Sequence, residues 1–153
     1  MTLPYVRAVL QETFRVSCLT FIGVPRYSKE DIRLQDGTFI PKNTTVMSNS
    51  YQIMNDETYW KEPERFNPSR FLDDSGAFHA DERVIVFGLG KRYCLGQSLA
   101  EKEFFLFFTI VMQQFKIFPS PGSPLPGHSI YDAPGTGVIR KTSPHTVRMK
   151  SRL

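Results

Sequence analysis

The chain has 153 residues, which is within the size range of a single domain. Hydrophobic residues make up 41% of it and its formal charge is only +4, so its composition excludes an intrinsically disordered chain and gives no reason to expect nucleic-acid binding. Its two cysteines are too few for a disulfide-rich scaffold. The longest apolar run lies near residues 104–112 and is shorter than the ~20 residues that cross a bilayer.

Two segments have the apolar spacing of helices. Pro4 suits a first helical turn, and the apolar residues that follow it predict a helix over about residues 4–16. The stronger pattern predicts a helix over about residues 96–115. Its apolar residues cover a wide face, so we expect this second helix to be deeply buried.

Strands are predicted between and after these helices. Asp36-Gly37 is a strong two-residue turn signal and predicts a hairpin between residues 32–35 and 38–40. Residues 44–48 read as a further strand. Alternation over residues 145–150 predicts a closing strand.

Residues 56–60 predict a short helix with Asp56 as its cap. The prolines and aromatic residues of 62–71 predict an irregular meander, because proline lacks a backbone donor and fixes its own φ. Together these signals predict an α+β fold that is mainly helical.

The glycine-rich segment 87–96 carries the candidate chemistry. It delivers Cys94 to the start of the predicted long helix, where the helix dipole and free backbone N–H groups favour a thiolate. Gly90 and Gly96 allow close backbone approach or unusual dihedral angles. Arg92 places a cation near the cysteine.

Three known uses of a glycine-rich or cysteine loop do not fit. A phosphate-binding loop requires Ser or Thr after Gly-Lys, but Arg92 follows Lys91. A dinucleotide fingerprint requires glycine where Tyr93 stands. A phosphatase-like cysteine would want an arginine at the position of Ala100. The remaining chemistry is a thiolate that ligates a metal or a haem iron.

At this point the sequence resembles the cytochrome P-450 family. The haem-binding loop of that family is similar to Phe87-x-x-Gly90-x-Arg92-x-Cys94-x-Gly96, followed by Ala100. Two more motifs stand in the family's order: Glu12-Thr13-Phe14-Arg15 resembles its ExxR helix, and residues 63–71, with Trp60, resemble its meander. The resemblance implies that residues 1–153 are the C-terminal part of a single P-450 domain, about a third of a typical member.

The resemblance also implies a haem b cofactor with Cys94 as the axial thiolate ligand of the iron. Phe87 would pack beside the sulfur, and Arg92 and Arg26 would each pair with a haem propionate. The positions that the resemblance assigns to the cofactor are Phe87, Gly90, Arg92, Cys94, Gly96, Ala100 and Arg26. Glu12, Arg15 and Arg70 would form a buried ion-pair network that locks the meander against the first helix.

The substrate pocket would be lined by the segment after the first helix and by the tip of a C-terminal hairpin, about residues 134–138. The residues that the resemblance places there are Leu19, Thr20, Phe21, Ile22, Gly23, Val24 and Thr136.

The implied function is that of a haem-thiolate monooxygenase, which inserts one atom of O2 into a small apolar organic substrate. Electrons would come from NADPH through cytochrome P-450 reductase, for which Lys91, Arg92 and Lys102 could form a docking face. The pattern looks most like animal microsomal members, which implies the cytoplasmic face of the endoplasmic reticulum membrane. The membrane anchor and the central oxygen-activating helix of the family would lie in an N-terminal portion that this chain lacks.

Two alternatives stay open. The chain could be a truncated, non-catalytic fragment, with or without haem, or its parent could be an isomerase or a peroxide-using enzyme.

Cys18 is interpreted as an ordinary core residue. The three histidines, His79, His128 and His145, lack metal-ligand spacing and are interpreted as surface residues.

Overall fold

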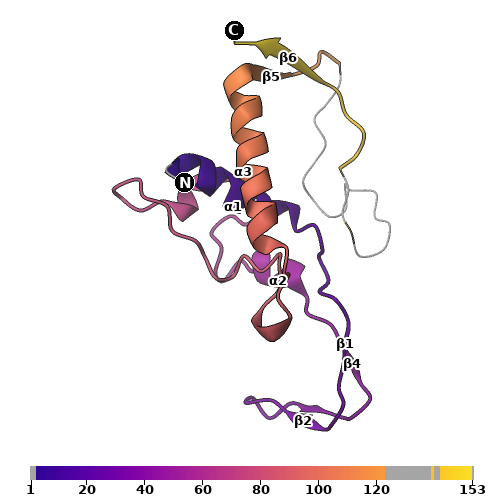
Figure 1. The fold of residues 1–153 in the computed structure, drawn as a ribbon. Coiled ribbons are helices and arrows are strands. Elements are labelled where there is room, and N and C mark those ends of the chain that lie inside the picture. Colours follow the sequence, from indigo (N-terminus) through magenta and orange to yellow (C-terminus); the bar gives the residue numbers. More distant parts are fainter. Residues whose placement is uncertain (1–2, 123–138, 140–141, 153) are drawn as a thin grey trace.

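A computed structural model describes residues 3–122, 139 and 142–152. Helix α1 (Pro4–Ser17) and the longer helix α3 (Gln97–Gln114) pack against each other, and the short helix α2 (Ser50–Met54) lies near them (Figure 1). Two 3-10 turns, η1 (Pro68–Phe71) and η2 (Gly90–Arg92), interrupt the irregular chain between α2 and α3. In the described part of the chain, no helix is long and apolar enough to cross a membrane.

The strands form small antiparallel sheets. Two of the strand pairs form an arm that extends away from the helices, and the third pair follows the C-terminal end of α3 (Figure 1). The pairs are β1 (Arg26–Tyr27) with β4 (Thr45–Val46), β2 (Ile32–Arg33) with β3 (Phe39–Ile40), and β5 (Phe115–Pro119) with β6 (Val147–Ser151). Helices combined with small sheets agree with the predicted α+β class.

The hairpin predicted around Asp36-Gly37 is confirmed, but its predicted two-residue turn is wrong. Arg33 pairs with Phe39 and Leu34 faces Thr38, so residues 35–37 form a three-residue loop. Gly37 adopts a φ of +88°, a left-handed conformation that glycine reaches without steric cost. The Asp36 carboxylate accepts the Thr38 amide at 2.9 Å, and the Leu34 amide donates to the Thr38 carbonyl at 2.9 Å. Local turn chemistry therefore determines this hairpin.

The short helix predicted over residues 56–60 is wrong. The helix lies earlier, at Ser50–Met54, where the Asn49 side chain caps it by accepting the Gln52 amide at 3.0 Å. Asp56 instead accepts the amide and the hydroxyl of Thr58, at 3.0 and 2.6 Å. An acidic side chain that bonds two residues ahead makes a turn of its own, so it does not begin a helix here.

The predicted deep burial of the long helix is also wrong. Its large apolar side chains are exposed, and Phe107 reaches 74% exposure. Others on this helix that are at least half exposed are Leu99, Phe104, Leu106 and Ile110. The helix is apolar on most sides. Among the described residues, α1 packs against it, and many of its apolar side chains stay uncovered.

A small core joins α1 to the meander. Ala8 of α1, Trp60 and Phe71 are buried against one another, and three partly buried residues pack around them: Leu72, Phe78 and Val84. The Trp60 indole N–H donates to the Ile53 carbonyl at 3.0 Å, which satisfies the polar end of this buried ring.

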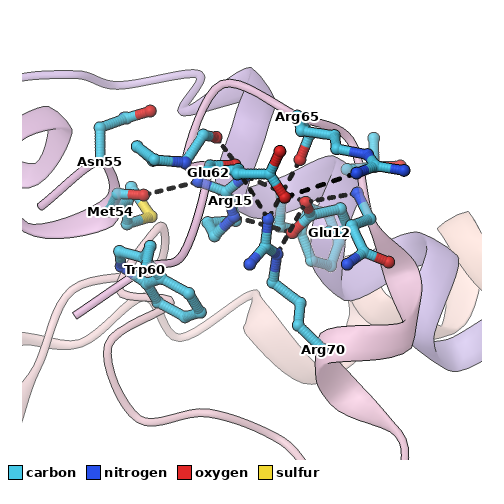
Figure 2. A network of polar contacts seen from close by, with 12 residues as sticks. Glu12, Arg15, Met54, Asn55, Trp60, Glu62, Arg65 and Arg70 are labelled. Atoms are coloured by element: carbon cyan, nitrogen blue, oxygen red, sulfur yellow. Dashed lines mark hydrogen bonds and ion pairs between the residues drawn. The ribbon is translucent and has the colours of Figure 1, made fainter. Parts of the chain in front are cut away.

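A buried ion pair lies beside this core (Figure 2). Glu12 and Arg15, both on α1, have no exposed surface. The Arg15 Nε and Nη2 atoms donate to the two carboxylate oxygens of Glu12 at 2.7 and 3.0 Å. Its guanidinium also donates to the Met54 carbonyl at 2.8 Å and to the Pro63 carbonyl at 2.6 Å. The pair therefore ties α1 to both α2 and the meander.

Arg70 of η1 completes this network. Its Nε donates to Oε1 of Glu12 at 3.1 Å, and the same oxygen accepts the Asn67 amide at 2.8 Å. The remaining Arg70 donors bind main-chain carbonyl oxygens of the meander, those of Lys61, Glu62 and Arg65. One carboxylate thus holds α1 and η1 together, and Arg70 fixes the path of the chain between them.

The next loop is organised by a second carboxylate. Asp73 accepts the amides of Ser75 and Ala77, both at 2.9 Å, and the Ser75 hydroxyl at 2.6 Å. The His79 ring lies 2.8 Å from its other oxygen. The hydrogen bond from the Ser75 hydroxyl, followed by that from His79, holds the pKa of Asp73 well below its ordinary value.

Arg15→Ala is expected to lower the free energy of unfolding by about 3–5 kcal/mol, because it leaves the Glu12 carboxylate buried without its main partner. Arg65→Ala is the matched control. It also removes an arginine three residues after a glutamate, but that pair is 69% and 57% exposed, so the expected change is below about 1 kcal/mol. Urea unfolding followed by circular dichroism measures both values. Equal losses would contradict the assigned role of the buried network.

The loop at residues 73–79 is expected to resist acid. Since the pKa of Asp73 is lowered in the folded chain, its contribution is present above the ordinary carboxyl pKa and is lost as the pH falls through the lowered value. The amide chemical shift of Ala77, followed by NMR, should therefore titrate below the ordinary range of about pH 4. Asp73→Asn should abolish this titration, whereas Asp74→Asn should leave it in place. A titration of the Ala77 amide near pH 4 would contradict the assignment.

Candidate functional site

Two glycines with left-handed backbone shape the cysteine loop. Gly88 and Gly90 have φ angles of +75° and +66°, which a side chain would strain. The loop turns twice, with the Gly88 amide bonded to the Ile85 carbonyl at 2.9 Å and the Tyr93 amide bonded to the Gly90 carbonyl at 3.1 Å. Gly90 was expected to need such freedom. The need at Gly88 was missed, although the loop's glycine content signalled it.

Of the two uses expected of Gly96, an unusual dihedral angle is absent. Its φ is −84°, which other residues adopt, and it stands as the N-cap of α3. A Cβ added there would lie 3.8 Å from the Cys94 sulfur, which is an ordinary contact. Glycine at this position therefore keeps the sulfur side of the loop open, with no strained turn. The amide of Ala100 donates to the Gly96 carbonyl at 2.9 Å and continues the helix.

Cys94 is a free and exposed cysteine, whereas Cys18 is buried. The Cys94 amide donates to the Phe87 carbonyl at 2.8 Å, and its own carbonyl accepts the Gln97 amide at 3.2 Å. Both main-chain groups are therefore fixed while the sulfur stays accessible. The position just before α3 also favours a negatively charged group, because the helix dipole is positive at its start.

The side chain of Phe87 contacts α1. Its ring centroid lies 5.5 Å from that of Phe14, with the planes 78° apart. Phe14 also meets Phe104 of α3 edge to face, at 5.4 Å and 89°. The sequence places Phe14 in the apolar pattern of the first helix and within the Glu12-Thr13-Phe14-Arg15 motif, but gives it no partner. Helical spacing does not reveal which distant rings a side chain will meet.

The two arginines expected near a haem are exposed but lie on different elements. Arg92 ends η2 within the cysteine loop. Arg26 lies on β1, where it pairs in register with Val46 of β4. Both leave a cation at the surface, where an anionic ligand can reach it.

The segment expected to line a substrate pocket begins where α1 ends. Cys18 closes the helix in a left-handed conformation, with its amide bonded to the Phe14 carbonyl at 3.1 Å. Residues 19–24 then run beside residues 48–51, with Phe21 and Gly23 bonded to that stretch through main-chain groups at 3.0 and 2.8 Å. Thr20 also bridges to Ile139. Thr136 and the rest of 134–138 lie outside the described residues.

The described residues fit a haem group. Cys94 offers a single exposed thiol. Among the described residues other than the chain neighbours of Gly96, only the Cys94 sulfur lies within 4 Å of a Cβ built at Gly96, so the Gly96 side of the sulfur is uncrowded. Among the residues that the structure places, no three His, Cys, Asp or Glu side chains gather as a metal ion would require. A site with one thiolate donor suits an iron whose other ligands come from a porphyrin.

Gly23 meets the neighbouring stretch closely. A Cβ added to it would overlap the Ser48 hydroxyl, whereas the Ser48 Cβ and carbonyl would be at 3.4 and 3.5 Å. Gly23→Ala is expected to lower the free energy of unfolding by about 1 kcal/mol, because the hydroxyl must move. In the Ser48→Ala background the same change should cost almost nothing. A urea double-mutant cycle measures this coupling, and equal costs in both backgrounds would show that the overlap is not what requires glycine.

The sequence of this chain is similar to those of known proteins. The family model described as "Cytochrome P450" matches residues 1–149. Cytochrome P450 2K4 of Oncorhynchus mykiss is 38% identical over 140 residues, which cover 86% of this chain and 28% of that protein. Cytochrome P450 2D26 of Mus musculus is 41% identical over 135 residues, which cover 88% and 27%. Cytochrome P450 2K1 of Oncorhynchus mykiss is 37% identical over 151 residues, which cover 99% and 29%.

The chain therefore spans less than a third of the length of these relatives. The match nevertheless extends over helices α1, α2 and α3, the meander and the cysteine loop. With a family model covering almost all of its residues and relatives near 40% identity, this chain belongs to the cytochrome P450 family.

Proposed function

We propose that this chain supplies the haem-thiolate site of a monooxygenase. The observation that carries the proposal is Cys94, an exposed free thiol whose main-chain groups are both bonded at the start of α3. In this proposal residues 1–153 are the C-terminal part of one P450 domain, and the parent protein is the enzyme. The bound haem supplies the activation of O2 that inserts one oxygen atom into an apolar organic substrate.

The chain's own residues bind and orient. The Cys94 thiolate ligates the iron, and the Phe87 carbonyl fixes the Cys94 main chain from which the sulfur projects. Gly96 leaves the space next to the sulfur free of a side chain, and Gly90 leaves the turn before the cysteine uncrowded. Arg92 and Arg26 form charge-assisted hydrogen bonds to the two propionates. Ala100 keeps the first turn of α3 narrow behind the loop.

The remaining roles follow the same proposal. Residues Leu19 to Val24, together with Thr136, line the substrate side. Electrons arrive from NADPH through cytochrome P450 reductase, which docks near Lys91, Arg92 and Lys102. The parent protein resides at the endoplasmic reticulum membrane, facing the cytoplasm. What supports this location is the resemblance of the chain's motifs to those of animal microsomal members of the family.

A second candidate is a fragment that binds haem without turning over substrate. The exposed apolar side chains of α3, such as Leu106 and Phe107, favour it for the 153-residue chain by itself. The two functions separate on addition of reductase, NADPH and an apolar substrate. A haem-loaded chain that consumes NADPH and forms hydroxylated product is an enzyme, and one that does neither is a binding fragment.

The reduced carbon-monoxide difference spectrum tests the iron ligand. After titration with haem, the chain is expected to give the red-shifted band of thiolate ligation, and Cys94→Ala is expected to lose it completely. Cys18→Ala is the matched control, because it removes the buried cysteine and should retain the band. A chain that takes up no haem, or a Cys94→Ala variant that keeps the band, would overturn the proposal.

A further inference from the structure

Phe14 contacts both flanks of the cysteine loop. Phe87 lies in the first of the two loop turns, and Phe104 lies on the helix that follows the loop. Each ring meets Phe14 edge to face, at 5.5 and 5.4 Å. Edge-to-face pairs are favourable because the positive edge of one ring faces the negative face of another. One side chain of α1 therefore sets the distance between the two ends of the loop.

Phe87 links Phe14 to Cys94 directly. The Phe87 ring rests on Phe14, while its carbonyl accepts the Cys94 amide at 2.8 Å. A shift of Phe87 would therefore displace the hydrogen bond that holds the cysteine. The intervening Gly88 and Gly90 have little conformational restriction of their own, so the loop depends on its anchored ends.

Helix α1 carries Phe14 and the buried ion-pair network on different sides. Residues 14 and 15 lie about 100° apart around a helix. Arg15 points to the buried network of Glu12 and Arg70, and Phe14 points to the loop and α3. The ion-pair network fixes the helix on one side and thereby fixes the ring on the other.

We propose that Phe14 is a positioning residue, which holds Cys94 where its sulfur can ligate the haem iron by bracing Phe87 against α3. This inference rests on the proposed function only for the haem part. The placement of the Cys94 main chain is a property of the chain itself and is measured without cofactor.

Amide hydrogen exchange of the full chain without haem gives the first test. Phe14→Leu is expected to speed exchange of the Cys94 amide by about tenfold, since both ring pairs are lost. Phe14→Tyr keeps the ring and should stay within about twofold of the parent chain. Phe107→Leu makes the same change on an exposed ring of α3 and should have no effect on this amide.

The Asn67 amide, which donates to Glu12, is the internal reference. Faster exchange at Cys94 with Asn67 unchanged supports the proposal. An unchanged Cys94 amide overturns it. Equal acceleration at both amides also overturns it, because Phe14 would then stabilise the whole chain without positioning the loop.

The haem-loaded chain gives the second test. Phe14→Leu should bind haem with the same stoichiometry but show a smaller share of the thiolate-type band in the reduced carbon-monoxide spectrum, and Phe14→Tyr should restore it. An unchanged share in Phe14→Leu overturns the haem part of the inference. Loss of the band in the parent chain contradicts the proposed function, and the exchange measurement still decides the role of Phe14.

Discussion

The carboxylate of Glu12 is the point on which the other contacts depend. It is fully buried, and a buried carboxylate is stable only when its oxygens are paired and hydrogen-bonded. Its partners come from α1 itself, from η1 and from the main chain of the meander, through Arg15, Arg70 and Asn67. If any one of these elements moved alone, the Glu12 carboxylate would lose a hydrogen-bond partner or become exposed. The meander, although irregular, therefore follows one defined path.

Helix α1 supports both the meander and the cysteine loop because different faces of the helix contact each of them. One face carries the ion pair and Ala8, which packs in the small core beneath Trp60 and Phe71. Another carries Phe14, which meets the cysteine loop and α3. The loop itself contains two glycines in left-handed conformations and has little stiffness of its own. Main-chain bonds to Phe87 and Gln97 hold the cysteine, and the Phe87 ring in turn packs on Phe14 of α1.

Local chemistry allowed much of the secondary structure to be predicted. Asp36-Gly37 determines its hairpin because the carboxylate and the glycine together make the turn. The helix expected near Asp56 lies instead at Ser50–Met54, because both Asn49 and Asp56 are good caps and the sequence does not decide between them. The apolar pattern of α3 predicted the helix correctly but predicted its burial wrongly. Periodicity shows which side chains are apolar, but it does not show what packs on them.

The sequence by itself determined the family and the candidate site: a cysteine in a glycine-rich loop before a helix, with an ordered set of motifs that agrees with the family match. Residue types and short spacings are written in the chain, and they suffice for turns, helices and a candidate ligand. The tertiary structure decided which distant groups meet. It brought Phe14 against Phe87, Gly23 against Ser48, and Arg70 onto Glu12. Contacts of this kind depend on how elements far apart in the chain pack, and no local pattern encodes them.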